Sequence, residues 1–249
     1  MTTESKVPDA AGGEELSGQV ALVTGGTGAL GRHVILALHD RGASVHATWV
    51  DESEVDSLKR FLGPAGDRVH LHRTDVTDPD QVEDLLARIG DEAAPPSILC
   101  NLVGGFSMAP VEETSVSDWR NLLEVNATSA FVCSRAALPL MRTAGWGRIV
   151  NVSAFPALER GQGRLAAYSA SKAAVLNLTH SLSREAVENG VTVNALVPKI
   201  IDTPANREAM PDADPSTWIP PREIADVLAF VVSDRARTLT GAALTLTLD

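Results

Sequence analysis

Cysteine and tyrosine are scarce in this chain of 249 residues, which has two of the first and one of the second. Cys100 and Cys133 both lie inside apolar segments, where a small buried thiol is the ordinary outcome, so no disulfide framework is expected. The chain also lacks an N-terminal leader pattern and any apolar run near the roughly 20 residues that span a bilayer. These absences predict a cytoplasmic protein with no membrane partner.

Positive charge is also in short supply. The chain has 21 basic side chains against 32 acidic ones, which gives a formal net charge of −11. A surface of that sign repels phosphate backbones, and no run of lysine or arginine offsets it. Nucleic acid is therefore not expected as a partner, and no metal site is expected.

What is present is an alternation of short apolar runs with longer stretches of helical periodicity, beginning near Leu16. Continuous Val, Ile, Leu and Ala runs are typical of strands buried on both faces, and the long helical stretches between them are typical of crossovers. The pattern predicts a single-domain α/β protein, a doubly wound Rossmann fold with a seven-stranded, mainly parallel sheet and helices on both faces. The expected strands are 19–24, 44–49, 68–73, 97–101, 147–153, 191–197 and 242–248, and the expected helices are 30–41, 53–62, 79–90, 118–143, 168–189 and 221–233.

Two segments fall outside this alternation. Residues 1–15 are small and polar, and we expect them to form a flexible tail ahead of the domain at 16–249. Residues 203–221 form a long irregular stretch after the sixth strand, at the edge of the sheet where ligands bind in such folds. We expect this stretch to be a substrate lid, with an exposed connection as the alternative.

A glycine-rich turn, from Thr24 to Gly31, joins the first expected strand to the first expected helix. Glycines let the backbone approach a pyrophosphate closely, and the free N–H groups at the start of the helix stabilise its charge. In this context the turn predicts dinucleotide binding rather than a merely structural bend. The candidate cofactor contacts within it are Gly25, Thr27, Ala29, Leu30 and Gly31.

The turn resembles the Thr-Gly-x-x-x-(Gly/Ala)-x-Gly motif of the short-chain dehydrogenase/reductase family, with Ala29 in place of the usual glycine. Further features of that family follow in order over 16–248. The resemblance implies that Asp75 and Val76 lie at the adenine ring, and that Asn126 bends the central helix and holds a proton-relay water. It also implies cofactor contacts after the fourth and sixth strands, from Asn101, Val103, Gly104, Pro198, Ile201 and Thr203.

The end of the second expected strand bears on the choice between NAD(H) and NADP(H). An acidic residue there excludes the 2′-phosphate of the adenosine ribose, whereas a basic residue attracts it. Trp49 falls at the diagnostic position, and Asp51 and Glu52 follow with no basic residue beside them. The sequence therefore favours NAD(H), although this acidic pair is equally an ordinary opening to the next helix.

Tyr168 and Lys172 are four residues apart in a helical pattern, so they share one face of the helix. A phenol with a pKa of about 10 is a poor base at neutral pH, and a neighbouring ammonium, together with the positive charge of an oxidised nicotinamide, lowers that pKa. The pair is therefore predicted to move a proton while hydride passes between a nicotinamide and the substrate. The resemblance implies that Lys172 also binds the nicotinamide ribose.

The strand before that helix departs from the family pattern. It reads Asn151-Val152-Ser153-Ala154 where relatives carry Asn-x-Ser-Ser, so Ala154 takes the place of the serine that polarises a carbonyl. Ser153 is one residue early and should point away from the nicotinamide, unless the strand end is irregular and gives it a substrate contact. Without that donor an ordinary ketone is a demanding substrate, and Ser169 and Thr203 are the candidate substitutes.

The missing serine, the Val-Gly-Gly run at 103–105 and the segment 196–218 resemble the dihydropteridine reductase branch of the family, with Trp218 a candidate substrate contact. The sequence thus predicts NAD(P)H-dependent hydride transfer to an activated acceptor, such as a quinonoid, C=N or activated carbonyl compound. The alternative is a cofactor-binding relative without redox turnover, in a regulatory or biosynthetic role. The resemblance also implies a homodimer or homotetramer, paired through the helices at 118–143 and 168–189.

Overall fold

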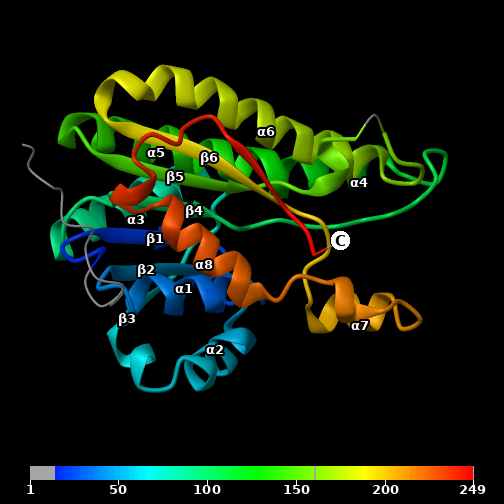
Figure 1. Ribbon diagram of the computed structural model, residues 1–249, viewed down its shortest axis with the longest axis horizontal. Helices are drawn as coiled ribbons and strands as arrows, with labels where there is room; N and C mark the ends of the chain where they lie inside the picture. Colours follow the sequence, from blue (N-terminus) through cyan, green and yellow to red (C-terminus); the bar gives the residue numbers. More distant parts are fainter. Residues whose placement is uncertain (1–14, 160, 249) are drawn as a thin grey trace, which may run out of the picture.

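The computed structural model describes residues 15–159 and 161–248, so the predicted tail at 1–15, except its last residue, lies outside the described residues. Seven strands form one sheet in the order β3-β2-β1-β4-β5-β6-β7, and every neighbouring pair is parallel (Figure 1). This confirms the predicted fold class and makes the mainly parallel sheet a wholly parallel one. The strands are β1 (Val20–Val23), β2 (Ser44–Trp49), β3 (Val69–Arg73), β4 (Ile98–Asn101), β5 (Gly147–Val152), β6 (Val191–Pro198) and β7 (Ala243–Leu246).

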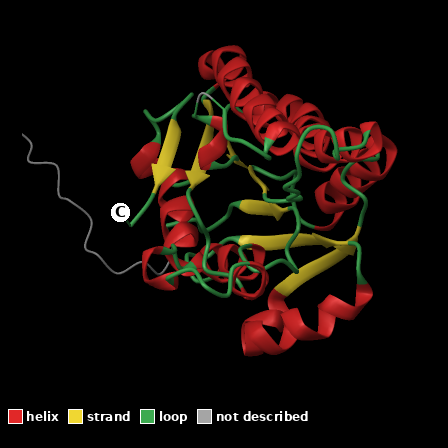
Figure 2. Cartoon of the chain, turned by 90° about the vertical axis from the view of Figure 1, so that its right-hand side faces the viewer, coloured by secondary structure: helices red, strands yellow, loops and turns green. Residues whose placement is uncertain are grey.

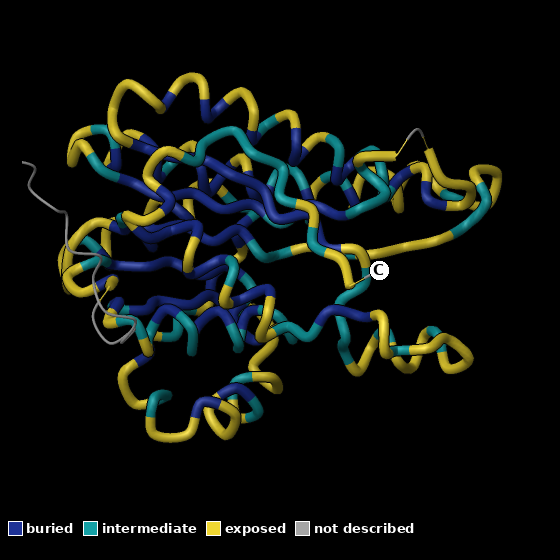
Figure 3. The backbone as a smooth tube through the Cα atoms, viewed as in Figure 1, coloured by how far each residue is buried: buried dark blue, intermediate teal, exposed yellow. Residues whose placement is uncertain are grey.

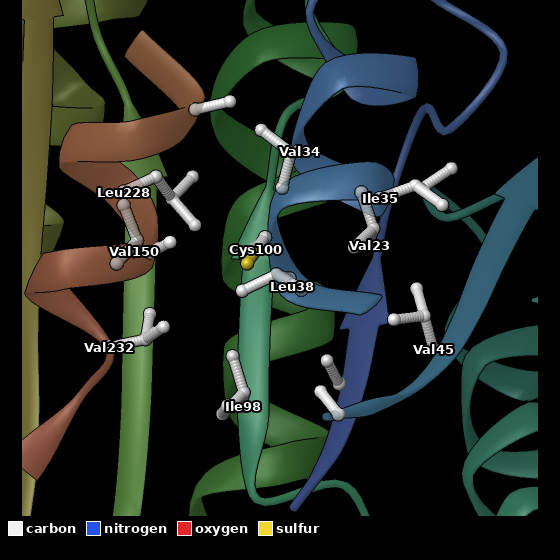
Figure 4. Packing of buried hydrophobic residues seen from close by; sticks show 14 of the residues in the cluster. Val23, Val34, Ile35, Leu38, Val45, Ile98, Cys100, Val150, Leu228 and Val232 are labelled. Atoms are coloured by element: carbon white, nitrogen blue, oxygen red, sulfur yellow. The ribbon is translucent and has the colours of Figure 1, made fainter. Parts of the chain in front are cut away.

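Helices cover both faces of the sheet because its central strands are apolar on both sides (Figure 2). The helices are α1 (Gly31–His39), α2 (Val55–Leu62), α3 (Pro79–Glu92), α4 (Val116–Leu123), α5 (Ser129–Ala144), α6 (Ala166–Ala186), α7 (Pro204–Ala209) and α8 (Pro221–Val231). On one face α1 and α8 pack on β1, β4 and β5, and Leu38, Cys100 and Leu228 belong to the buried cluster between them (Figure 4). On the other face α3, α5 and α6 enclose a second buried cluster.

The carboxyl ends of all the strands lie at one edge of the sheet, since the strands are parallel. The loop before α4 and the segment that carries α7 both extend beyond this edge, at the right of Figure 1. The central strands of the sheet are buried, whereas both extensions are largely exposed (Figure 3). Within the described part of the chain, no helix combines the length and the apolar character that crossing a membrane requires.

Two predicted elements differ from those in the structure. The helix predicted at 118–143 is divided into α4, a π-helical turn at Glu124–Thr128, and α5, which continues to Ala144. The stretch 203–221, expected to be irregular, contains α7 and a 3-10 turn at Pro215–Thr217. Pro204 and Pro215 give this stretch the sequence pattern of an irregular loop. Each stands, however, at the first position of a short helix, where a missing N–H costs nothing.

Candidate active site

Tyr168 and Lys172 lie in the first two turns of α6, and Lys172 reaches the carboxyl end of β5. Lys172 is only 6% exposed, and its ammonium donates a hydrogen bond of 2.9 Å to the carbonyl oxygen of Val152, the last residue of β5. The ring of Tyr168 meets Phe106 edge to face, with 4.9 Å between ring centroids. The hydrogen bond to β5 thus fixes the side chain of Lys172, and Phe106, in the loop after β4, packs against the ring of Tyr168.

Burial shifts the two side chains in opposite directions. It raises the pKa of Tyr168 to about 12 and lowers the pKa of Lys172 to about 8, because a low-dielectric site disfavours the charged form of each group. Burial therefore dominates the pKa of Tyr168 in the chain by itself, and the lowering expected from the ammonium together with an oxidised nicotinamide stays a prediction. At neutral pH Tyr168 is a phenol, which can donate a proton.

Asn126 lies in the π-helical turn between α4 and α5 and is 1% exposed. Its Nδ2 donates to the carbonyl oxygen of Gly105 (3.0 Å) and to Oγ of Ser171 (2.9 Å), and its Oδ1 accepts from the N–H of Gly105 (2.9 Å). A π turn of this kind inserts one residue into a helix and re-aims the side chains around it. Here it ties the loop after β4 to α6.

Gly104 fits against both Asn126 and Lys172. A Cβ atom at this position would lie 2.7 Å from Oδ1 of Asn126 and 2.9 Å from Nζ of Lys172, closer than atoms of these kinds approach. The loop after β4, the π turn and α6 therefore converge on one point, where a side chain on residue 104 would displace Asn126 or Lys172.

Ser153 and Ala154 are adjacent at the end of β5, but their side chains have different surroundings. The hydroxyl of Ser153, 2% exposed, donates 2.8 Å to the backbone carbonyl oxygen of Lys172, so it faces into the protein. Ala154 is 6% exposed and begins the 3-10 turn at Phe155–Ala157. Of the two substitute donors, Ser169 has a buried Oγ with no hydrogen-bond partner among the described residues, and Thr203 caps α7 by accepting from the N–H of Asn206.

The glycine-rich turn is shaped by backbone contacts. Gly25 has φ +66°, and a Cβ on Gly31 would lie 2.2 Å from the carbonyl oxygen of Gly25. Leu30 precedes α1 without a side-chain cap, and no acidic residue stands in the first turn of that helix. A pyrophosphate fits such a turn, since the N-terminal end of the helix dipole favours an anion and α1 has no acidic side chain of its own in its first turn. The turn could thus hold a dinucleotide through the residues that the sequence predicted.

Glu54 is a neighbour of this turn that the sequence analysis missed. The hydroxyl of Thr27 donates a hydrogen bond to the Glu54 carboxylate, and Arg32 donates one of 2.9 Å to the carbonyl oxygen of Thr27. Glu54 follows β2 in the 3-10 turn that leads into α2. The contact joins two segments 27 residues apart, and no local pattern in the sequence marks it.

The predicted contacts after β3 and β4 divide into two kinds. Asp75 is exposed and its Oδ1 accepts from Thr77, whereas Val76 is buried beside it. Asn101 turns inward: its Nδ2 donates 2.8 Å to Oδ1 of Asn151, and its Oδ1 is buried without a partner among the described residues. The side chain of Asn101 therefore holds β4 to β5, and Val103 and Gly104 lie beyond it in the loop.

Pro198 ends β6, and the chain after it forms a loop whose two ends lie side by side. Ile201 pairs with Ile219 in an isolated parallel bridge, and the N–H of Asp202 donates 2.9 Å to the carbonyl oxygen of Ile219. Trp218, a candidate substrate contact, is 4% exposed and so lies in the base of this loop. Thr203 begins α7 directly beyond the bridge.

Comparisons with known proteins agree with this geometry. The family model of the short chain dehydrogenases matches residues 19–214. The chain is 36% identical to cis-4-hydroxycyclohexanecarboxylate dehydrogenase of Sinomonas cyclohexanicum, over 93% of this chain and 96% of that one. It is 34% identical to a 3-oxoacyl-(acyl-carrier-protein) reductase of Vibrio cholerae, over 92% and 96%, and 35% identical to galactitol 2-dehydrogenase of Rhizobium johnstonii, over 91% and 93%.

Solved structures give the same result. A blue fluorescent protein from a metagenomic library, solved in complex with NADPH, superposes with a TM-score of 0.82 at 30% identity, covering 94% of this chain and 98% of that one. A short-chain dehydrogenase/reductase mutant of Serratia marcescens superposes with a TM-score of 0.84 at 26% identity, with the same coverage. The protein is an NAD(P)-dependent oxidoreductase that belongs to the short-chain dehydrogenase/reductase family.

Proposed function

We propose that this oxidoreductase transfers hydride to a small-molecule acceptor that is already activated, such as a quinonoid, C=N or activated carbonyl compound. The observation that carries the proposal is the methyl group of Ala154, in the place where the family resemblance expects a carbonyl-polarising hydroxyl. The adjacent hydroxyl cannot replace it without breaking a contact, since Ser153 donates to the carbonyl oxygen of Lys172. An acceptor that is electron-poor from the start needs less polarisation by the protein.

Tyr168 is the proton donor in this proposal. A bound reduced nicotinamide would supply the hydride for the carbon of the double bond. The phenol of Tyr168 would give its proton to the nitrogen or oxygen at the other end of that bond. Lys172, charged below a pH of about 8, stabilises the phenolate that remains. A proton from solvent then restores the phenol.

Few polar atoms of Asn126 are free to bind the water of such a proton relay. Both N–H groups of its side chain are engaged by Gly105 and Ser171, and its Oδ1 already accepts one hydrogen bond. A water at this residue would therefore bind to the backbone carbonyl or to the second lone pair of Oδ1. We propose Asn126 as a positioning residue rather than a proton donor.

NAD(H) is the cofactor that the surroundings of the turn favour. Asp51 and Glu52 follow β2 with exposed side chains, and the contact with Thr27 brings the carboxylate of Glu54 onto the turn itself. Three carboxylates at this end of the sheet repel the 2′-phosphate that distinguishes NADP(H). NADP(H) is the alternative, and the NADPH bound to the metagenomic relative favours it.

Reduction of ordinary ketones, or oxidation of secondary alcohols, is the second candidate function. It is favoured by the names of the three relatives, two of which are dehydrogenases of hydroxylated compounds and one a 3-oxoacyl reductase. For this reaction another donor must act in place of Ala154, and Ser169 is a candidate because its buried hydroxyl has no hydrogen-bond partner among the described residues. A quinonoid dihydropterin remains one acceptor of the first class, proposed from the likeness of the segment 196–218.

An acceptor panel tests the two candidates, with NADH or NADPH oxidation as the readout. Quinonoid, cyclic imine and α-diketone acceptors are compared with cyclohexanone, for the wild type and for Ala154→Ser. We expect wild-type kcat/KM to favour the activated acceptors by about 100-fold or more, and Ala154→Ser to raise the ketone rate alone by about tenfold. Equal rates for both classes, unchanged in the variant, would establish the second candidate instead.

We also propose a homodimer or homotetramer built on α5 and α6, as the family resemblance implies. Phe131 and Leu140 on α5 are exposed, and Val187 follows α6 with half of its surface exposed. Exposed apolar side chains on helices that pack against each other are compatible with a subunit interface. Analytical ultracentrifugation measures the oligomeric state directly. A cytoplasmic location and a substrate-lid role for residues 203–221 stay predictions.

A further inference from the structure

Three histidines gather on one face of the two strands at the edge of the sheet, away from the candidate active site. His46 of β2 pairs in register with His70 of β3, and their rings stack with 4.5 Å between centroids. His72, two residues further along β3, has its Nε2 3.0 Å from Nδ1 of His46. In a strand, residues two apart point to the same side, so the parallel register brings the three rings together.

Glu92, the last residue of α3, completes this group. One potential ligand atom from each of His46, His70 and Glu92 lies within 4.8 Å of the other two. His46 is fully buried, whereas His70 and Glu92 are exposed, so the cluster has a buried end and an end open to solvent.

The buried end contains a polar atom that the fold does not satisfy. His46 uses Nδ1 toward His72, and its Nε2 is buried with no hydrogen-bond partner among the described residues. Buried polar side-chain atoms in folded proteins are nearly always partnered, so an orphan of this kind requires an explanation. A ring nitrogen can be satisfied by a metal ion as well as by a hydrogen bond.

We propose that His46, His70 and Glu92 form a binding site for a divalent transition metal ion, with His72 as the hydrogen-bond partner that orients His46. Two imidazoles and one carboxylate suit ions such as Zn²⁺, which take three protein ligands and keep one open position. The contact between His46 and His72 matches the usual arrangement in which a metal-bound imidazole donates its other N–H to a neighbouring acceptor. His46 then binds the ion through Nε2.

Binding requires one local rearrangement. Ligand atoms about 2.0–2.2 Å from a tetrahedral ion lie about 3.4 Å apart, closer than the limit of 4.8 Å that the three atoms meet here. The lone pair of an imidazole lies in the plane of its ring, and the planes of His46 and His70 are only 12° from parallel. His70 must therefore turn out of the stack to share an ion with His46, and its exposure leaves room for that rotation.

The consequence of binding is stabilisation of this edge of the fold. An ion held by β2, β3 and the end of α3 links three elements, and ligands that bind the folded state alone raise its apparent stability. The sequence shows no metal-ligand spacing, because 24 residues separate His46 from His70 and only the strand register joins them.

The test uses tag-free protein, stripped of metal by a chelator that is then removed, and titrated with Zn²⁺ by calorimetry and with Co²⁺ by visible absorption. We expect one equivalent of Zn²⁺ to bind and to raise Tm, and we expect Co²⁺ to give the intense bands of a four- or five-coordinate site. His70→Gln and Glu92→Gln, both at exposed positions, should each weaken binding about tenfold or more. His180→Gln, at an exposed histidine on α6, is the control and should bind as the wild type does.

Two results would overturn the proposal. One is the absence of stoichiometric binding to the wild type under these conditions. The other is binding that survives in His70→Gln and Glu92→Gln but weakens in His180→Gln, which would place the ion elsewhere. Because His70→Gln and Glu92→Gln lie outside the candidate active site, circular dichroism and NADH binding check independently that these two variants remain folded.

Discussion

The hydroxyl of Ser153 donates a hydrogen bond of 2.8 Å to the backbone carbonyl oxygen of Lys172, and the ammonium of Lys172 donates one of 2.9 Å to the carbonyl oxygen of Val152. The end of β5 and the second turn of α6 are thus joined twice. These two contacts fix the end of β5, where the hydroxyl of Ser153 points into the protein and Ala154 is the next residue along the chain.

Ser153→Ala is expected to affect stability more than turnover. Removal of the hydroxyl loses one buried hydrogen bond, which corresponds to about 1 kcal/mol of unfolding free energy. Chemical denaturation should detect this loss, while kcat for the preferred acceptor should change by less than about threefold. A fall in kcat of about 100-fold or more, the usual effect of removing an oxyanion donor, would instead give Ser153 a direct role in the reaction.

Tyr168→Phe tests the proton donor. The substitution removes only a hydroxyl, so the ring can keep its edge-to-face contact with Phe106. We expect kcat to fall by about 100-fold or more, as for loss of a general acid, while the Kd for NADH stays within about threefold of the wild type. Fluorescence titration and steady-state kinetics measure the two quantities, and wild-type turnover in the variant would disprove the mechanism.

Much of the fold could be predicted from the sequence because its signals are local. The alternation of short strand-like runs with longer helical stretches predicted all seven strands, and the context of the glycine-rich turn marked the end of β1 as the candidate dinucleotide site. The π turn could not be read from periodicity, since one extra residue does not interrupt the apolar pattern across 118–143. A family resemblance at Asn126 was the signal that marked the bend.

Contacts between distant segments account for what the sequence did not predict. The bond from Thr27 to Glu54 and the grouping of His46 with His70 both depend on how neighbouring strands are placed, which no single segment encodes. The pKa of Tyr168 also depends on a contact between distant segments. The loop that carries Phe106 packs against the ring of Tyr168, and burial raises the pKa of this phenol in the chain by itself.

Lys172 should titrate far below an ordinary lysine. Its pKa is lowered from 10.5 to about 8 by burial, so it is charged below that pH and neutral above it. In protein with ¹³C-labelled lysine, one of the four lysine signals should titrate near pH 8 and should be missing from Lys172→Met. Because the positive charge beside Tyr168 disappears above this pH, the rate of acceptor reduction should fall as the pH rises through 8. A Lys172 signal that titrates near 10.5 would rule out this account.

Gly104→Ala tests whether the three segments at the site must converge as closely as they do. Its Cβ would stand 2.7 Å from Oδ1 of Asn126 and 2.9 Å from Nζ of Lys172, so the loop or both side chains must move. We expect the variant to lose about 1–3 kcal/mol of unfolding free energy, as overpacked sites do, and kcat/KM to fall by about tenfold or more. Gly163→Ala is the matched control, because a Cβ there meets no atom within 4 Å. If Gly104→Ala behaves like that control in both measurements, then the loop after β4 is mobile enough to yield, and the close approach of Gly104 to Lys172 does not position the ammonium for the reaction.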